Sequence, residues 1–174
     1  MLLLTVAPTR SCNFACPYCF EANRAGIDMN RETEEQLVRF AERFQPGHIF
    51  SVTWFGGEPL LRFGQIRRLS ERFRALDFRR YGAPLITNGY LLDADKAALL
   101  DDLAVREVQI TLDGPEEVHD RRRTLVSGGG TFRRILENID ALFASGWTGR
   151  LLLRVNVDRT NAEEYHRIYE FLYA

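Results

Sequence analysis

Three cysteines, the only ones in the chain, lie between positions 12 and 19 with the spacing Cys12-x3-Cys16-x2-Cys19. An odd number of thiols this close together makes a poor disulfide framework, because one of them must stay unpaired. In a reducing compartment, clustered thiols more often bind metal. The segment is therefore the first candidate for chemistry, set against the alternative of three incidental thiols.

Three soft thiolate ligands fit two kinds of site, zinc or an iron–sulfur cluster. Structural zinc needs four closed ligands, usually as two separate pairs. The histidines of the chain, His48, His119 and His166, lie far from the thiols in sequence and show no ligand spacing. An iron–sulfur cluster held by three cysteines would keep one iron open to a ligand from outside the protein, which is a catalytic arrangement.

Short apolar runs alternate with amphipathic helical patterns along the chain, and this alternation predicts βα units around a parallel sheet. The predicted strands cover Leu2–Val6, Ile49–Phe55, Leu85–Thr87, Val108–Leu112 and Leu151–Val157. Each strand is followed by a predicted helix. The first helix begins near Asn30, and the second carries an apolar stripe from Ile66 to Leu76. The third begins at Asp93 and the fourth near Thr131. The fifth opens at Asn161, with Glu164 in a capping-box arrangement.

The predicted strands alternate polar and apolar residues, whereas strands buried on both faces of a parallel sheet are usually apolar throughout. Ile110 points to one face, and its neighbours Gln109 and Thr111 point to the other; Arg154 and Asn156 give the last strand a similar polar face. Buried polar groups without partners are costly, so this face should line a wet or liganded space. A closed or partly closed βα barrel fits this better than a flat sheet and places the site at the carboxyl ends of the strands, where the cysteine segment follows the first strand.

With these features the chain resembles the radical S-adenosylmethionine (SAM) superfamily. The motif of that family is Cys-x3-Cys-x2-Cys with an aromatic residue before the last cysteine, here Tyr18. Further motifs follow in the order of the family's peptide-modifying branch, which includes anaerobic sulfatase-maturing enzymes and maturases of ribosomally made peptides. They are Trp54–Pro59, Ile86–Gly89, Leu112–Pro115, His119–Arg123 and Gly130–Phe132.

The resemblance implies that Cys12, Cys16 and Cys19 hold a [4Fe–4S] cluster, whose open iron is chelated by the amine and carboxylate of SAM. The implied reaction is reductive cleavage of SAM to methionine and a 5′-deoxyadenosyl radical, which abstracts hydrogen from a peptide or protein substrate. An electron donor such as flavodoxin or ferredoxin is the second implied partner. Two alternatives stay open: a radical SAM enzyme acting on a nucleoside or small molecule, and a non-catalytic zinc- or cluster-binding interaction module.

The resemblance also suggests which residues bind SAM. Gly56, Gly57 and Glu58 would approach its amino group, with glycine allowing close backbone access; the alternative is a tight strand-to-helix turn. Tyr18 would pack near the adenine. No catalytic residue can be named.

Polar residues further along the chain complete the expected SAM site. Arg154 fits the SAM carboxylate as a cation facing the lumen, and a salt bridge with Asp113 or Glu58 is the alternative. Asn88 or Asn156 would serve the ribose or the adenine edge. Asp113 either contacts the ligand or forms a turn. The motif residues before the fourth helix, including His119 and Arg123, are interpreted as loop.

Composition limits the rest. A net charge of −1 gives no electrostatic case for nucleic acid or an acidic membrane as a partner. No stretch approaches the roughly 20 apolar residues of a membrane span, and Met1–Val6 lacks a basic leader, so we expect a cytoplasmic protein. The 174 residues fit one domain. We expect a radical SAM core over residues 1–174, an α/β partial (β/α) barrel of about five βα units, truncated before the end of the barrel and without an auxiliary-cluster domain, because no cysteine follows Cys19.

Overall fold

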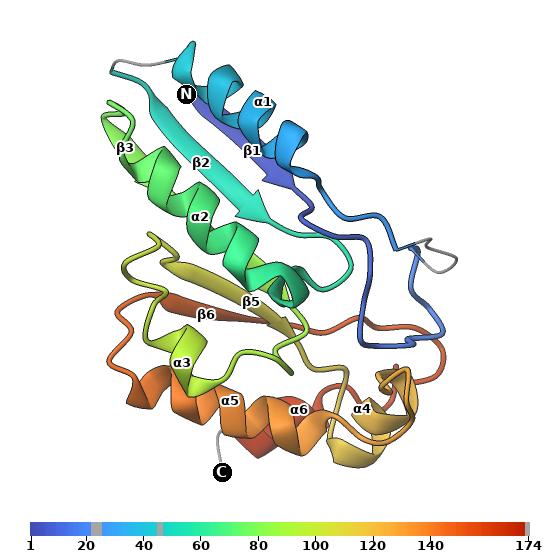
Figure 1. Cartoon of the computed structure of the whole chain (residues 1–174). Coiled ribbons are helices and arrows are strands. Elements are labelled where there is room, and N and C mark those ends of the chain that lie inside the picture. The colour runs from blue at the N-terminus through green and yellow to red at the C-terminus, as the bar shows by residue number, and fades with distance from the viewer. Residues whose placement is uncertain (22–25, 45–46, 173–174) are drawn as a thin grey trace.

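A single parallel sheet runs through the computed structural model, which describes residues 1–21, 26–44 and 47–172. The strand order is β1-β2-β4-β5-β6, and β3 also pairs with β2. The strands are β1 Leu2–Val6, β2 Ile49–Trp54, β3 Arg80–Gly82, β4 Leu85–Thr87, β5 Glu107–Thr111 and β6 Arg150–Arg154. The arrowheads of β1, β2, β5 and β6 point toward the side of the molecule where the segment after β1 crosses (Figure 1). The predicted α/β class and parallel sheet are confirmed.

Helices connect these strands. They are α1 Arg31–Glu42, the 3-10 helix η1 Pro59–Arg62, α2 Phe63–Arg74, α3 Ala94–Ala97, α4 Glu116–Arg122, α5 Phe132–Ala144 and α6 Arg167–Leu172. Two predicted helix starts are confirmed by their caps, since Asn30 accepts a hydrogen bond from the Thr33 amide at 2.8 Å and Asp93 accepts one from the Lys96 amide at 3.0 Å. No described helix combines the length and hydropathy that a membrane span requires.

Apolar side chains of the central strands and the helices form one core. In β2 and at β5 the apolar face is completely buried, as the alternation predicts, at Phe50, Val52, Trp54, Val108, Ile110 and Leu112. Phe50 of β2 meets Phe73 of α2 edge to face, with 5.1 Å between ring centroids. The opposite face of these strands is thereby free to carry polar groups.

β6 differs from the other predicted strands. It stands last in the strand order, and Leu152 and Leu153 are each 38% exposed. Val157, predicted to share the buried apolar face, lies beyond the strand end and is 51% exposed. The expectation of a uniformly buried apolar face is therefore wrong for this strand, which pairs with β5 on one side and has no described strand on the other.

Several predicted element limits also need correction. The strand β3 and the helix α4 were not predicted, so His119, inside α4, and Arg123, its C-cap, are not simple loop residues. Helix α2 ends at Arg74 and α3 at Ala97, before the predicted stripes end, although Leu100 and Leu103 are buried in the turns that follow. Three predicted strands, ending at Phe55, Leu112 and Val157, ran one to three residues too far, whereas Leu2–Val6 and Leu85–Thr87 match β1 and β4.

The predicted capping box at Asn161 is wrong, because α6 begins only at Arg167. The Asn161 side chain instead joins two loops: its amide donates to the carbonyls of Asp113 at 2.8 Å and Asn156 at 2.9 Å, and its oxygen accepts from the Asp158 amide at 2.8 Å. The residue is 1% exposed. Tertiary contacts at the strand ends therefore outweigh the local capping tendency.

The start of α5 is capped from α4 rather than by its own residues. Asp120 accepts hydrogen bonds from the amides of Thr131 at 2.7 Å and Phe132 at 2.9 Å. A Cβ on Gly130 would lie 2.1 Å from the Asp120 carboxylate, so a larger residue there would displace the carboxylate from these two amides. This joint fixes the two helices beside the strand ends.

His119 is buried at the same joint. Its Nδ1 accepts from the Asp113 amide at 3.3 Å, and its Nε2 lies 3.0 Å from the Thr131 hydroxyl. The hydroxyl donates to the Arg123 carbonyl at 2.6 Å, so Nε2 must be the donor to it and the ring is neutral. Burial, with the nearby Arg123 cation, lowers the pKa of His119 to about 3.

This depressed pKa predicts a loss of stability in mild acid. Unfolded histidine binds a proton below a pKa of about 6.5, whereas folded His119 does not. The contribution of His119 to the free energy of unfolding should therefore fall by about 1.4 kcal/mol per pH unit below that value. Urea unfolding of cluster-free protein should show the stability gap between parent and His119→Gln narrowing by about 1 kcal/mol between pH 7 and pH 5.5. The exposed His166→Gln is the control; an equal gap at both pH values would contradict the prediction.

Candidate functional site

The cysteine segment crosses the carboxyl ends of the strands as a loop anchored from a distant part of the chain. The Ala15 amide donates to the Thr124 carbonyl and the Val126 amide donates to the Asn13 carbonyl, both at 2.9 Å. Phe14, 7% exposed, packs edge to face on Tyr90 with 5.9 Å between ring centroids. The loop is thus held by residues after α4 and after β4, far from it in sequence.

The glycines after β2 touch the backbone of the same segment. The Gly57 amide donates to the Thr9 carbonyl at 3.1 Å, and the Glu58 amide donates to the Ser11 carbonyl at 2.8 Å. A Cβ on Gly57 would lie 2.1 Å from the Ser11 oxygen, and one on Gly56 would lie 2.4 Å from the Thr9 oxygen. Gly56 also has a φ of +123°, which glycine adopts without strain. Both glycines therefore position the residues that lead into Cys12.

The Glu58 carboxylate is fully buried and forms hydrogen bonds inside the protein. One oxygen accepts from the Leu60 amide at 2.9 Å and the Thr87 hydroxyl at 2.7 Å, and the other accepts from the Asn88 amide at 2.8 Å. Burial raises the pKa of Glu58, and these hydrogen bonds oppose the rise. Glu58 caps η1 and joins the ends of β2 and β4, and its side chain does not line the cavity described next.

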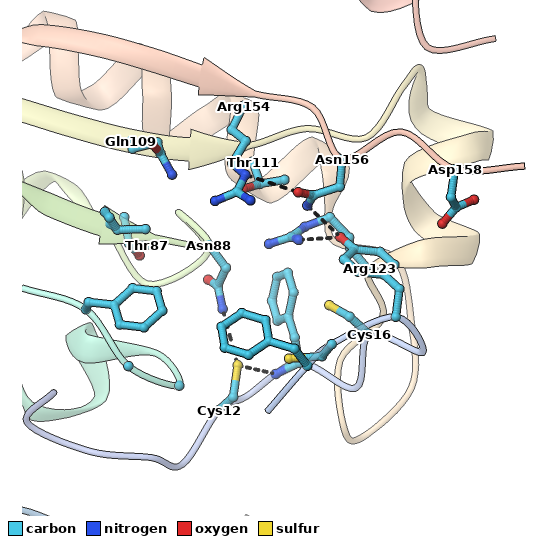
Figure 2. Close-up of a pocket in the computed structure, with 18 of the residues that line it drawn as sticks. Cys12, Cys16, Thr87, Asn88, Gln109, Thr111, Arg123, Arg154, Asn156 and Asp158 are labelled. Atoms are coloured by element: carbon cyan, nitrogen blue, oxygen red, sulfur yellow. Dashed lines mark hydrogen bonds between the residues drawn. The ribbon is translucent and has the colours of Figure 1, made fainter. Parts of the chain in front are cut away.

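A cavity of about 340 Å³ lies between the cysteine loop and the strand ends. Figure 2 shows side chains projecting from the strands and from the segment after α4 toward the space that Cys12 and Cys16 border. The predicted polar lumen is thus present. Its polar and cysteine lining residues are Cys12, Cys16, Tyr18, Cys19, Gly56, Gly57, Thr87, Asn88, Gln109, Thr111, Arg123, Arg154, Asn156 and Asp158.

Tyr18 links the loop to the far wall of the cavity. Its hydroxyl donates to the Asp113 carboxylate and accepts from Arg123 Nη1 at 2.7 Å and from Asn156 Nδ2 at 3.3 Å. Burial raises the pKa of Tyr18 to about 12, so the phenol is neutral. The hydroxyl end of the ring is committed to these partners, while Tyr18 also lines the cavity.

Asp113 lies behind the cavity wall and is 0% exposed. Besides Tyr18, its carboxylate accepts from the Asn156 amide at 3.0 Å and pairs with Arg122 at 3.4 Å. Arg154 forms no salt bridge with Asp113 or Glu58, the alternative that its sequence position allowed; its Nε donates to Asn156 Oδ1 at 3.1 Å, and the side chain faces the cavity. Asp113 therefore braces the wall, and Arg154 and Asn156 form part of its surface.

Arg123 is a functional candidate that the sequence interpretation missed. It is 8% exposed and lines the cavity with its guanidinium 5.5 Å from the Phe14 ring centroid. Its Nε is buried and has no hydrogen-bond partner in the described structure. The available signal in the sequence was the cation at the end of the motif His119–Arg123. The helix α4, which positions Arg123, was not predicted. Arg123 thus brings a cation to the cavity wall, while its Nε is enclosed by the surrounding protein.

Asn88 contacts the cysteine loop directly. Its Nδ2 donates to Asn13 Oδ1 at 2.8 Å and lies 3.9 Å from Cys12 Sγ, while its Oδ1 accepts from the Tyr90 amide at 3.0 Å. It also lines the cavity. Asn88, predicted to bind the ligand, therefore also holds the cysteine loop in place beside Cys12.

Three thiol donors from one loop meet at the cavity, and soft thiolates are the ligands of iron–sulfur clusters. All three cysteines are partly exposed and line one cavity. Burial raises the pKa of Cys16, against the opposing effect of Arg123. Among the described residues, no three His, Cys, Asp or Glu side chains are arranged to hold one metal ion.

Residues 6–172 match the family model described as the radical SAM superfamily. The chain belongs to this superfamily. Radical SAM enzymes use a [4Fe–4S] cluster and SAM, and their fold is a partial TIM barrel, as expected from the sequence. The cysteine motif and the polar lumen are thus features of a chain that belongs to an enzyme superfamily.

Curated relatives of this radical SAM chain have more than one activity. A cysteine-type anaerobic sulfatase-maturating enzyme of Clostridium perfringens is 30% identical over 98% of this chain and 48% of its own length. A probable GTP 3′,8-cyclase of Methanocella arvoryzae is 29% identical over 97% of this chain and 52% of its own length. The chain therefore spans about half the length of these relatives.

Solved structures of radical SAM enzymes share the fold. Native anSMEcpe with bound AdoMet and a Cp18Cys peptide matches 99% of this chain and 47% of that chain at a TM-score of 0.86 and 25% identity. Streptococcus suis SuiB bound to S-adenosylmethionine matches 98% of this chain and 36% of that chain at a TM-score of 0.70 and 18% identity, which shows the fold alone.

The backbone contact at Gly57 predicts a local and severe effect of a small substitution. Gly57→Ala should displace the segment before Cys12, since its Cβ would overlap the Ser11 carbonyl. After anaerobic reconstitution, the variant should retain less than about a tenth of the parent's iron and sulfide, because rigid backbone atoms oppose the new methyl group. Gly64→Ala in α2, where the atom nearest to the new Cβ lies 3.7 Å away on the flexible Arg68 side chain, is the matched control and should keep full cluster content. Equal cluster content in both variants would refute the positional role.

Proposed function

We propose that Cys12, Cys16 and Cys19 hold a [4Fe–4S] cluster, and that the adjoining cavity binds SAM for reductive cleavage. One observation carries the proposal: the three thiols, the two glycines after β2 and the polar strand ends border the same cavity. When bound, the cluster and SAM supply a 5′-deoxyadenosyl radical that abstracts hydrogen from a substrate. Residues 1–174 are then the core of a radical SAM domain.

Side chains of the cavity wall would bind and orient SAM. Arg123, a cation that lines the cavity beside the cysteine loop, is our choice for the SAM carboxylate, and Arg154 is the second cation of the lining. Asn88 and Asn156 offer amides for the ribose or the adenine edge. Tyr18 lines the cavity beside them with its hydroxyl already bonded.

The backbone of the two glycines and the two buried acids would have other roles than the side chains that bind SAM. Gly56 and Gly57 leave main-chain atoms open to the cavity, in keeping with an approach to the SAM amino group. Glu58 and Asp113 have their carboxylates bonded within the protein. We therefore assign both acids to holding the cavity wall, through η1 and β4 for one and through Tyr18 for the other.

A peptide or protein is the substrate that we favour. The match to anSMEcpe with a bound peptide covers nearly the whole chain at a TM-score of 0.86. The GTP 3′,8-cyclase relatives make a nucleoside triphosphate the second candidate. The charged residues of the described lining are two cations, Arg123 and Arg154, and one acid, Asp158. This small excess of positive charge suits the single carboxylate of SAM better than it would suit an added triphosphate. A flavodoxin or ferredoxin is the proposed electron donor.

Anaerobic reconstitution of the complete protein tests the proposal. With iron and sulfide the protein should gain cluster absorbance, and with SAM and dithionite it should form 5′-deoxyadenosine. Changing all three cysteines to alanine should abolish both signals, since no other thiol is present in this chain. Zinc uptake without sulfide and no 5′-deoxyadenosine would instead support a non-catalytic binding module.

The same assay separates the two substrate classes. A cysteine-containing peptide should accelerate 5′-deoxyadenosine formation and change mass, whereas GTP should do neither. Acceleration by GTP with a cyclised purine product would reverse the assignment.

Arg123 can be tested on its own. Removing a charge-assisted hydrogen bond to the SAM carboxylate costs about 1.5–3 kcal/mol, so Arg123→Gln should raise the Kd for SAM roughly 10- to 100-fold. Equilibrium binding to the reconstituted protein measures this. The exposed neighbour Arg121 in α4 supplies the control Arg121→Gln, which should bind SAM like the parent. Unchanged SAM affinity in Arg123→Gln would remove this residue from the proposed site.

A further inference from the structure

Arg122 and Arg123 are adjacent but their side chains have different surroundings. Arg123 lines the cavity, whereas Arg122 does not. Arg122 is nevertheless only 6% exposed. Its guanidinium lies 4.7 Å from the Tyr18 ring centroid, on the cysteine loop. A buried cation outside the SAM cavity needs an explanation, because desolvating a guanidinium is costly unless its donors are used.

All the guanidinium nitrogens of Arg122 are engaged by two chain segments. Nε pairs with Asp113, at the end of β5, at 3.4 Å. Nη1 donates to Asp158 at 2.8 Å and also to the Thr160 hydroxyl, and Nη2 donates to the Asn156 carbonyl at 3.2 Å. Arg122 thus connects the cysteine loop, the end of β5 and the loop after β6.

These contacts fix the backbone at Asn156. Its amide donates to Asp113 at 3.0 Å, and its carbonyl accepts from Arg122 at 3.2 Å and from Asn161 at 2.9 Å. With both main-chain groups held, Asn156 lines the cavity. Its side-chain Nδ2 donates to the Tyr18 hydroxyl at 3.3 Å, and its Oδ1 accepts from Arg154 Nε at 3.1 Å.

We propose that Arg122 is a positioning residue for SAM binding, which acts by holding Asn156, and through it Arg154, against the cavity without touching SAM. This inference rests on the proposed function of the cavity. Asn161 also holds the Asn156 carbonyl, but among the described residues only Arg122 joins that carbonyl to both the Asp113 carboxylate and the Tyr18 ring. Its loss should weaken SAM binding while the cysteine loop, anchored separately at Thr124 and Val126, still holds the cluster.

A double-mutant cycle on the reconstituted, full-length protein tests this. The variants are Arg122→Gln, Asn156→Ala and the two combined, with Arg121→Gln as the matched control on the exposed side of α4. Each is measured for iron and sulfide content, for the Kd of SAM, and for the change that SAM causes in the electron paramagnetic resonance spectrum of the reduced cluster. The spectral change reports how SAM sits at the cluster, which a loss of overall stability would not alter.

Arg122→Gln should keep its cluster and bind SAM about tenfold more weakly, with a reduced spectral change. Asn156→Ala should show a loss of similar size. The double variant should be no more than about twofold worse than Asn156→Ala, because Arg122 acts through that residue. Arg122→Lys should behave like the glutamine variant, since an ammonium cannot reproduce the planar set of donors.

Three results would overturn the inference. One is parental SAM binding in Arg122→Gln; another is an additive loss of about a hundredfold in the double variant. If Arg122→Gln does not fold, the milder variant Thr160→Val is used, which removes one exposed acceptor of Arg122. It should weaken SAM binding about twofold in the parent but not in Asn156→Ala. An equal loss in both backgrounds is the third result that would overturn the inference. A parent that forms its cluster but binds no SAM would instead reject the proposed function.

Discussion

Backbone contact between two loops is the constraint on which the site depends. The carbonyls of Thr9 and Ser11 accept hydrogen bonds from Gly57 and Glu58, at a separation that leaves no room for a Cβ on either glycine. β1 and β2 are parallel neighbours, so their carboxyl ends emerge together and the two loops must cross. Gly56 and Gly57 allow that crossing to be close, which brings the cysteine segment over the strand ends instead of away from them.

Buried charge then secures the opposite wall. Asp113 is completely buried, and its carboxylate is compensated by Arg122 and by hydrogen bonds from Tyr18 and the Asn156 amide. Each partner comes from a different part of the chain, so the acid can be satisfied only when the cysteine loop, α4 and the loop after β6 are all in place. Removal of one partner would leave a buried charge exposed to a low-dielectric interior, which is why the network behaves as a unit.

The sequence predicted the parts of the site that obey short-range rules. The alternation in β2 and at β5 and the helix caps at Asn30 and Asp93 follow from neighbours in the chain, and each was found where expected. The helix α4 was missed because Gly114 and Pro115 read as a turn, although Glu116 and Glu117 favour a helix start just after them. The role of Asn161 was misjudged for a different reason: its partners lie at two distant strand ends, and no local pattern announces them.

Glu58 shows why an acid in a motif need not contact the ligand through its side chain. A carboxylate beside two glycines in a ligand-binding family suggests direct contact with the ligand amine. Glu58 could make that contact only by giving up bonds to the Leu60 amide, the Thr87 hydroxyl or the Asn88 amide, and each buried donor left without a partner costs about 1–3 kcal/mol. An ammonium group would have to repay that cost as well as its own desolvation. The arrangement of lower free energy keeps the Glu58 hydrogen bonds within the protein. The backbone of the glycines, which carries no side chain, is then the part that faces the ligand.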